Sequence, residues 1–428
     1  MPSAAVSRPI VAGPRHIVAV ALGSFGDVHP ILGVARALQD RGHAVDFIAN
    51  PLYEELVRSN GLAFHAIGAE QDFLDVIENP KMWLPRHGVR ILGESLILPY
   101  MRPTFELIER LRRPETILIA PVTAFGARIA NEVFDLPLAT LDLQPVLFRS
   151  ELDSPGLPLE PLSRWAPLGR LLRRAIYWTA DMLFFDPVLQ RPTNAFRAEF
   201  GLEAIRRPFH DWVHSPDRTI GLFPPWYGEP QPDWPETARA TGFPRFDEAD
   251  QRPLPEGLEE FLAGGDAPIV FTPGTAMSQA RRFFEASVEV CRLLGRRGIL
   301  LSHFPEQIPQ PLPETMRYFE YVPLSRVLPR AAALVYHGGI GTASQALAAG
   351  IPHLVAPYSF DQPDNAARLH RLGVGRTLFP IFYSPRRAAE RLRWLLETPS
   401  VQAACRRWRE AIAAQDALGQ TCELIEAL

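Results

Sequence analysis

The N-terminal part of the chain alternates short apolar runs with segments whose apolar residues recur at helical spacing. An apolar run at 17–22 leads into a glycine turn, and helical spacing then holds from Ile31 to Leu38. Pro30 is expected in the first turn of that helix, where a missing N–H is harmless. Further strands are predicted at 44–49, 63–66, 116–120 and 138–141, and helices at 52–60 and 124–134. This alternation predicts a parallel sheet covered by helices.

A second alternating series follows in the C-terminal half. Its predicted strands are 269–271, 298–301, 333–336 and 353–356, and its predicted helices are 280–296, 341–349 and 361–372. The two series predict an α/β protein with two doubly wound, Rossmann-like domains that face each other across a cleft. Ligands of such sheets bind at the carboxyl ends of the strands, so the glycine turns there are the candidate sites.

The length of 428 residues supports two or three domains. We expect an N-terminal domain at 1–244, because the polar, proline-punctuated stretch 245–257 is typical of a linker. The C-terminal domain is then 258–428, and its last helix is expected to pack back on the first domain.

The segment 151–234 departs from the alternating pattern because it is rich in aromatic residues and proline. It holds five of the eight tryptophans, at positions 165, 178, 212, 226 and 234. One interpretation is an aromatic core with rigid loops. The other is the apolar wall of a pocket for a hydrophobic substrate.

Composition excludes several kinds of chemistry. The 44 basic and 48 acidic residues nearly cancel, which makes binding driven by nucleic-acid phosphates improbable. The single lysine, Lys81, follows no glycine-rich loop, so neither a Schiff-base mechanism nor a lysine-type phosphate loop is expected. The three cysteines form neither a disulfide framework nor a zinc-ligand pair. No apolar run approaches the ~18 residues that span a bilayer, so we expect a cytoplasmic protein, soluble or peripheral at the inner face of the membrane.

Arginines and leucines interleave between Arg164 and Trp178. A basic amphipathic helix of this kind can lie on an anionic membrane surface. The alternative is a solvated helix face that packs on its own domain.

The window 335–345 contains the most informative motif, a strand that breaks into three glycines before a helix. Glycines let the backbone approach a ligand, and the first helical N–H groups attract an anion. His337 and Thr342 can add hydrogen bonds to a diphosphate. A tight turn without a ligand is the alternative.

Asp361 and Gln362 follow the next strand and a proline-containing turn. A carboxylate beside a carboxamide can bracket the vicinal hydroxyls of a sugar. The alternative role for Asp361 is a helix N-cap. A diphosphate site together with a polyol site predicts binding of a nucleotide sugar.

With these motifs in place, the sequence resembles family 1 of the nucleotide-sugar glycosyltransferases, which have the GT-B fold. The resemblance implies that Tyr321 and Val322 contact the nucleobase and that Asp361 and Gln362 hold the sugar. It assigns the diphosphate to His337, Gly338, Gly339, Gly341 and Thr342, with Gly274 and Thr275 from the loop that opens the second domain. The acidic residue that usually holds the ribose is Gln345 here, which makes a deoxyribose donor more plausible.

The turn 23–30 resembles the branch of the family that includes sterol glucosyltransferases and bacterial lipid rhamnosyltransferases, where the turn ends in Gly-Asp-Val-x-Pro. Asp27 occupies the position of the catalytic histidine of other branches and is our candidate general base. A helix cap is its alternative role, and His29 is the rival base. Phe25, Trp83 and Trp226 are expected on the acceptor side.

The sequence therefore predicts an inverting glycosyltransferase that moves a hexosyl group from a nucleotide-diphosphate sugar, of the UDP-glucose or dTDP-rhamnose type, to a hydroxyl of a hydrophobic acceptor. A non-catalytic nucleotide-sugar-binding protein and a sugar-nucleotide epimerase are the alternatives. No cofactor and no metal are expected. His210 and His214 have the spacing of metal ligands on a helix, but no further ligand supports them and structural roles are favoured. The oligomeric state is open.

Overall fold

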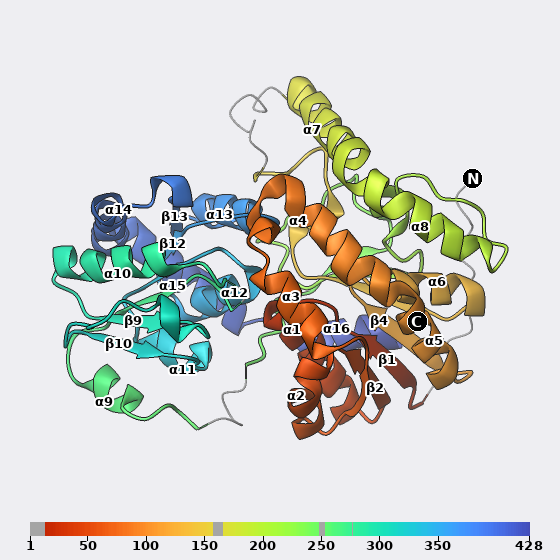
Figure 1. Ribbon diagram of the computed structural model, residues 1–428, viewed down its shortest axis with the longest axis horizontal. Helices are drawn as coiled ribbons and strands as arrows, with labels where there is room; N and C mark the ends of the chain where they lie inside the picture. The colour runs from red at the N-terminus through yellow and green to blue at the C-terminus, as the bar shows by residue number, and fades with distance from the viewer. Residues whose placement is uncertain (1–12, 157–165, 248–252, 276) are drawn as a thin grey trace. The chain divides into compact units, whose positions relative to one another are not determined.

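The computed structural model describes residues 13–156, 166–247, 253–275 and 277–428 (Figure 1). These residues divide into two compact units. The first unit comprises residues 13–154, 166–244 and 416–428, and the second comprises 155–156, 245–247, 253–275 and 277–415. Each unit contains one sheet in which every strand pairing is parallel.

The first unit is built on a seven-stranded sheet with the order β3-β2-β1-β4-β5-β6-β7. In chain order its strands are β1 (His16–Val20), β2 (Ala44–Ala49), β3 (Ala63–Ala66), β4 (Thr116–Ala120), β5 (Leu138–Asp142), β6 (Arg218–Gly221) and β7 (Ala238–Ala240). The central strands β1, β4 and β5 are buried along their whole length. Such burial on both faces explains their near-continuous apolar sequences.

Helices of the first unit connect these strands and pack around the sheet. They are α1 (Phe25–Asp40), α2 (Glu54–Ser59), α3 (Glu70–Glu78), α4 (Pro85–Leu92), α5 (Leu98–Leu111), α6 (Phe125–Phe134), α7 (Ala166–Ala180), α8 (Asp186–Ala198) and α16 (Ala417–Glu426). Shorter helical turns are η1 (Pro51–Tyr53), η2 (Pro80–Trp83), η3 (Gly93–Ile97), η4 (Pro145–Phe148), η6 (Asp181–Phe185) and η7 (Pro208–Trp212). One apolar core joins the sheet to α5, α6 and the end of η7.

The second unit is built on a six-stranded sheet with the order β10-β9-β8-β11-β12-β13. Its strands are β8 (Ile269–Thr272), β9 (Gly298–Leu301), β10 (Met316–Phe319), β11 (Ala333–Tyr336), β12 (His353–Val355) and β13 (Gly375–Thr377). Its helices are α9 (Leu258–Ala263), α10 (Arg281–Leu294), α11 (Leu324–Val327), α12 (Ile340–Ala349), α13 (Gln362–Arg371), α14 (Pro385–Glu397) and α15 (Pro399–Ala413), with the short turns η8 (Pro305–Gln307), η9 (Leu328–Arg330) and η10 (Pro380–Phe382).

The C-terminal helix α16 lies against α1 in the first unit (Figure 1). Glu426 accepts two hydrogen bonds from the guanidinium of Arg41, at 2.6 and 2.7 Å, and lies 2.9 Å from Nε2 of His43. The bond from Arg41 lowers the pKa of Glu426 to about 2. A buried hydrogen bond of 2.8 Å between the hydroxyls of Thr241 and Thr421 holds the same helix.

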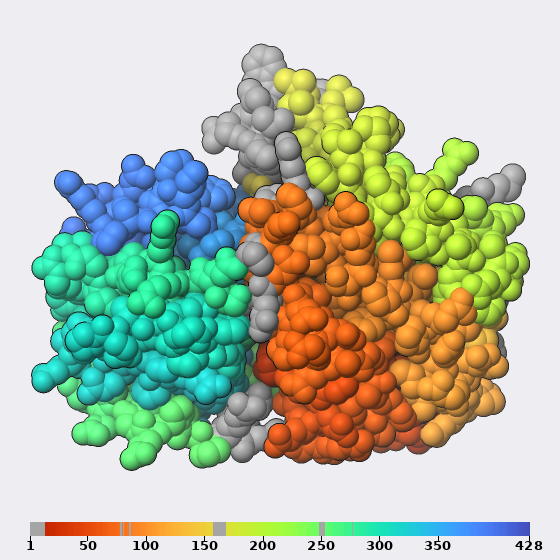
Figure 2. Space-filling view, viewed as in Figure 1, coloured from red at the N-terminus to blue at the C-terminus, as the bar shows by residue number. Residues whose placement is uncertain are grey.

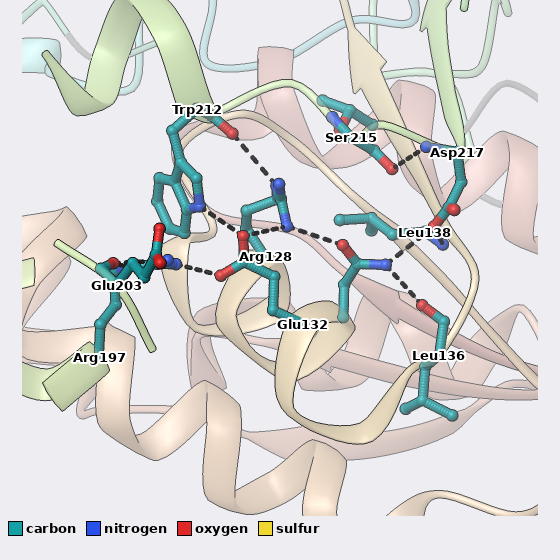
Figure 3. Close-up of polar contacts among 11 residues, drawn as sticks. Arg128, Glu132, Leu136, Leu138, Arg197, Glu203, Trp212, Ser215 and Asp217 are labelled. Carbon is teal, nitrogen blue, oxygen red and sulfur yellow. Dashed lines mark hydrogen bonds and ion pairs between the residues drawn. The ribbon is translucent and has the colours of Figure 1, made fainter. Parts of the chain in front are cut away.

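A polar network fixes the loop after η7 to α6 (Figure 3). Arg128 donates to the carbonyl oxygen of Trp212 at 3.1 Å, and the Trp212 indole donates to Glu132 at 3.0 Å. Asn131 donates to the Asp217 carboxylate at 2.8 Å. Because these side chains are mostly buried and mutually satisfied, the loop from 212 to 217 has little freedom.

The interleaved arginines of α7 contact the protein rather than solvent alone. Arg173 is buried and donates to the carbonyl oxygens of Glu151 and Leu152, and Arg170 forms an ion pair with Glu151 at 3.1 Å. Large apolar side chains lie at the surface instead, at Leu168, Leu171 and Trp178, where α7 is visible in yellow and yellow-green (Figure 2). Arg164 lies outside the described residues. Within the described ranges, no helix is both long and apolar enough to span a membrane.

Two expectations about helices are wrong. Helix α1 begins at Phe25, so Pro30 lies inside it rather than in its first turn. The contact between Ser24 and Asp27 starts the helix earlier than the apolar spacing shows, and the proline removes the N–H that would bond to Gly26. The single helix expected at 52–60 is split into η1 and α2.

A buried histidine–aspartate–histidine cluster joins the first three strands of the chain. The Asp46 carboxylate lies 2.7 Å from Nε2 of His16 and 2.6 Å from Nε2 of His65. The other nitrogen of His16 lies 2.7 Å from the Thr116 hydroxyl. Burial raises the pKa of Asp46, but the hydrogen bonds from both histidines outweigh it and hold the pKa below the usual value of 3.8.

We predict that Asp46→Asn lowers the free energy of unfolding by about 1–3 kcal/mol at neutral pH, since one histidine loses its acceptor and the other keeps only a neutral amide oxygen. Because the folded pKa of Asp46 is depressed, its stabilising contribution is complete above about pH 4 and is lost as the pH falls further. Urea titrations followed by circular dichroism should therefore show a gap between wild type and variant that closes in acid. Asp40→Asn, on the exposed end of α1, is the control. Equal stability of wild type and Asp46→Asn at pH 7 would contradict the prediction.

Candidate functional site

The turn between β11 and α12, together with the first turn of that helix, places three glycines at the carboxyl edge of the second sheet. Gly338 has a φ of 101°, a conformation that side chains disfavour. Its carbonyl oxygen accepts a 2.9 Å hydrogen bond from the buried amide of Asn365 on α13. Helix α12 then begins at Ile340. The N–H groups of its first turn have no partner within the helix and face the glycine turn. Such an arrangement can bind an anion through backbone dipoles.

His337 is enclosed by the glycines of two neighbouring turns. A Cβ on Gly339 would lie 2.4 Å from Nε2 of His337, and one on Gly274 would lie 2.8 Å from Cε1. Gly274 follows β8 and has a φ of 100°. Burial of the imidazole lowers the pKa of His337 to about 4. At neutral pH the ring is therefore uncharged and can donate one hydrogen bond.

Asp361, Gln362 and Asn365 form one cluster at the start of α13. Asp361 occupies the N-cap position, but its carboxylate makes no capping hydrogen bond and instead accepts from the Asn365 amide at 2.6 Å. The side-chain oxygen of Gln362 accepts from the N–H groups of Tyr358 and Ser359, at 2.8 and 3.2 Å. These contacts fix both side chains. Among the described residues, none accepts from Nε2 of Gln362.

The remaining candidates of the second unit lie on α12 or on other turns at the edge of the same sheet. Tyr321 follows β10 by two residues, and its ring lies nearly parallel to that of His303, with centroids 6.3 Å apart and planes at 21°. Val322 is buried. Gln345 and Thr342 lie on α12, and Thr275 is exposed after β8. Two residues were missed from the sequence. Asn365 links Gly338 to Asp361. His303 could have been found from its position just after β9, at the carboxyl edge of the sheet.

Asp27 lies in the first turn of α1, which follows β1 at the carboxyl edge of the first sheet. Its Oδ2 accepts from the Ser24 N–H at 2.8 Å and from the Ser24 hydroxyl at 3.0 Å. A Cβ on Gly23 would lie 2.4 Å from this oxygen, so the close approach needs glycine. Within the described chain no donor bonds to Oδ1. Desolvation raises the pKa of Asp27 more than the Ser24 hydrogen bonds lower it.

Aromatic rings support the Asp27 turn. Phe25 packs edge-on against Tyr53, with centroids 5.0 Å apart, and lies 5.4 Å from the His29 ring. The Tyr53 hydroxyl donates to the Gly23 carbonyl at 2.9 Å. Trp83 ends η2, and Trp226 packs edge-on near Phe243 at 6.2 Å; both tryptophans are partly exposed. Several other aromatic residues that the structure describes in the segment 151–234 belong to the core, including Phe223 and Trp212.

His210 and His214 face different acidic residues. Nε2 of His214 lies 3.0 Å from the Asp142 carboxylate, whereas His210 lies 3.7 Å from Asp211. In the part of the chain that the structure describes, no group of three or more His, Cys, Asp or Glu residues could hold a metal ion. A cavity of about 390 Å³ lies at the opposite, amino-terminal edge of the first sheet, near Arg15 and Thr116, and contains none of the candidate residues.

Comparison with known proteins finds one matching family model in the N-terminal part of the chain and one in the C-terminal part. The glycosyltransferase family 28 N-terminal domain matches residues 17–133, and the erythromycin biosynthesis protein CIII-like C-terminal domain matches residues 301–428. An O-mycaminosyltylonolide 6-deoxyallosyltransferase from Streptomyces fradiae is 28% identical over 433 residues, which cover 96% of this chain and 96% of that protein.

Solved structures show the same fold. The glycosyltransferase of kitacinnamycin superposes with a TM-score of 0.72 at 22% identity, over 97% of this chain and 99% of that one. Glycosyltransferase VinC in complex with DTDP superposes with a TM-score of 0.68 at 19% identity, over 96% and 99%.

Two Rossmann-like units with these matches define a glycosyltransferase of the GT-B fold. The matched domains and the relatives support an assignment to family 1 of these enzymes, whose members use nucleotide sugars. The fold class and the enzyme class predicted from the sequence are thereby confirmed.

We predict that His337 titrates near pH 4 rather than near its usual 6.5. The cause is the packing of the glycine turns around the ring, which disfavours the charged form. Nitrogen-15 NMR of histidine-labelled protein measures this directly, with His337→Gln to assign the signal. A His337 midpoint near 6.5 would show that the ring is open to water.

Proposed function

We propose that the protein transfers a deoxyhexosyl group from a thymidine-diphosphate sugar to a hydroxyl of a hydrophobic acceptor, with inversion at the anomeric carbon. The second unit binds the donor, and Asp27 of the first unit accepts the proton of the attacking hydroxyl. The acceptor oxygen forms a bond to the anomeric carbon as the bond from that carbon to the diphosphate breaks, and the electron pair leaves with the diphosphate.

The observation that carries this proposal is the geometry of Asp27. Both Ser24 contacts are made to Oδ2, which leaves Oδ1 as the oxygen that can take a proton. A raised pKa makes the carboxylate a stronger base than a surface aspartate. The helix-capping role and the base role are therefore carried by different oxygens of one side chain.

The second unit supplies what the leaving diphosphate requires. Backbone N–H groups at the start of α12 face the turn at Gly338 and Gly339, and fixed dipoles of this kind stabilise a developing negative charge without reorganisation. A neutral His337 adds one donor. We assign Gly341, Thr342, Gly274 and Thr275 to the same phosphates, Asp361 and Gln362 to the sugar, and Tyr321 and Val322 to the base.

Two observations support a thymidine-diphosphate deoxysugar. Gln345 stands where the family usually has an acidic residue that holds the ribose. A neutral amide lacks the strong hydrogen bond that a carboxylate accepts from a 2′-hydroxyl. The Streptomyces fradiae relative is named as a 6-deoxyallosyltransferase, and the VinC structure contains DTDP. A screen of UDP-glucose and dTDP-rhamnose against hydroxy fatty acids, sterols and phenols, measured by mass spectrometry, tests donor and acceptor together. Products formed only from UDP-glucose would overturn the donor assignment.

Asp27→Asn is expected to lower kcat for transfer by a factor of about 10² to 10⁴, because the amide cannot take the proton. Nucleotide affinity, measured by calorimetry, should be unchanged. Since the pKa of Asp27 is raised and the base must be ionised, kcat/KM of the wild type should fall in acid with a midpoint above 3.8.

Asp40→Asn, at the other end of α1, is the matched control and should retain full activity. Undiminished turnover by Asp27→Asn would exclude it as the base and leave His29 as the candidate.

Gln345→Glu should favour ribonucleotides. We expect the ratio of UDP to dUDP affinity to rise by roughly fivefold, the value of one added hydrogen bond to the 2′-hydroxyl. Because these two nucleotides differ only in that hydroxyl, calorimetry with both isolates the contact. Gln279→Glu, at an exposed site of the second unit, is the control; an unchanged ratio in Gln345→Glu would remove Gln345 from the ribose site.

Peripheral contact with a membrane through α7, the domain limits assigned above and the absence of a cofactor stay predictions, and the oligomeric state stays open. The exposed apolar residues of α7 support membrane contact, whereas the ion pairs of its arginines with Glu151 compete with binding to anionic lipid. Flotation with anionic vesicles is the test for it.

A further inference from the structure

A buried aspartate–histidine pair lies at the carboxyl edge of the first sheet, apart from the Asp27 turn. Asp142 is the last residue of β5 and its side chain is fully buried, with its Oδ2 3.0 Å from Nε2 of His214. Nε2 of His214 is closed off from solvent, while 13% of that side chain stays exposed. The 3.0 Å separation favours the tautomer with its proton on Nε2, although the pair lacks the angles of a regular hydrogen bond. Nδ1 is then the acceptor that a ligand can reach.

Hydrogen-bond acceptors outnumber donors at this strand end. Within the described residues no donor forms a hydrogen bond of normal geometry with either oxygen of Asp142 or with the buried Oε1 of Gln144. Gln144 follows Asp142 by two residues, in the bend between the end of β5 and the start of η4. Buried acceptors without donors are costly, and native proteins rarely keep several together. The group that completes this site must donate hydrogen bonds.

The imidazole of His214 is held by a stacked aromatic ring and by the fixed backbone on either side of it in sequence. Its ring stacks on Phe148, with centroids 5.7 Å apart and planes at 17°, and Phe148 stacks on Trp234 at 4.4 Å. The flanking backbone is fixed at Trp212 by Arg128 and at Ser215 by a 2.9 Å hydrogen bond from its N–H to the Thr140 hydroxyl. Figure 3 shows the network on this loop. A preorganised polar group within an aromatic wall is typical of a ligand site.

We propose that His214, positioned by Asp142 and assisted by Gln144, binds a second hydroxyl of the acceptor. The inference rests on the proposed function, because it assumes that the first unit binds the acceptor. In the sheet β5 lies two strands from β1, a separation of about 10 Å. The acceptor is therefore a rigid apolar molecule with a distal hydroxyl at about that distance from the one that attacks.

Three steroids that differ only at one end provide the test, measured by calorimetry in the absence of donor. Estradiol carries a distal hydroxyl at carbon 17, estrone carries a ketone that only accepts, and 17-deoxyestradiol carries neither. We expect the wild type to bind estradiol roughly five- to tenfold more tightly than either of the others, the value of one buried hydrogen bond. Equal affinities, or binding of none of the three, would overturn the proposal.

The variants His214→Phe and Asp142→Asn should abolish this preference, whereas His210→Gln, four residues away, should keep it. Asp27→Asn should keep it as well, so a failure of the catalytic proposal remains distinguishable from a failure of this one. If either site variant fails to fold, nitrogen-15 NMR of the wild type decides. Added estradiol should shift Nδ1 of His214 more than Nε2, and an unmoved Nδ1 signal contradicts the proposal.

Discussion

The central strands of both sheets are buried along their length, and this constraint determines where polar chemistry can lie. Side chains on both faces of these parallel strands are committed to the core, so the turns at the carboxyl edges carry the functional groups. In the second unit, Asn365 holds the Gly338 carbonyl and thereby fixes the turn that begins α12. In the first unit, Ser24 holds one oxygen of Asp27 and thereby starts α1. Each candidate site is a helix start fixed by a side-chain amide or hydroxyl.

Desolvation acts at both sites, with opposite consequences for charge. It lowers the pKa of His337, which stays neutral beside the glycine turn, and raises the pKa of Asp27, which becomes more basic. A diphosphate met by backbone dipoles and a neutral imidazole needs no lysine, which fits a chain whose single lysine, Lys81, lies on η2 of the first unit. The candidate diphosphate site therefore depends on the positions of backbone dipoles and uncharged side chains rather than on a large net charge.

The sequence alone predicts the α/β fold class and the central strands, because continuous apolar runs bounded by glycine turns mark buried parallel strands. Strands β4, β9 and β11 have the predicted limits. Two short strands were not predicted: β6, next to the edge of the first sheet, and β13, at the edge of the second, since Arg218–Gly221 and Gly375–Thr377 have no apolar run. The start of α1 was misplaced because Pro30 resembles a first-turn residue.

The candidate site was predictable only as far as local motifs extend. The glycine turn and the Asp361–Gln362 pair are contiguous in sequence, and a family resemblance gives them roles that stay predictions. The partnership of His214 with Asp142 and the stacking of His303 near Tyr321 join residues far apart in the chain, and only the folded sheets bring them together.

The most direct test of the account is the anomeric configuration of the product relative to its donor, read from the one-bond carbon–proton coupling at the anomeric carbon by NMR. Direct displacement assisted by a single base at Asp27 requires inversion, so the product should carry the configuration opposite to that of the donor. Retention of configuration would require a mechanism without this single displacement and would contradict the role assigned to Asp27.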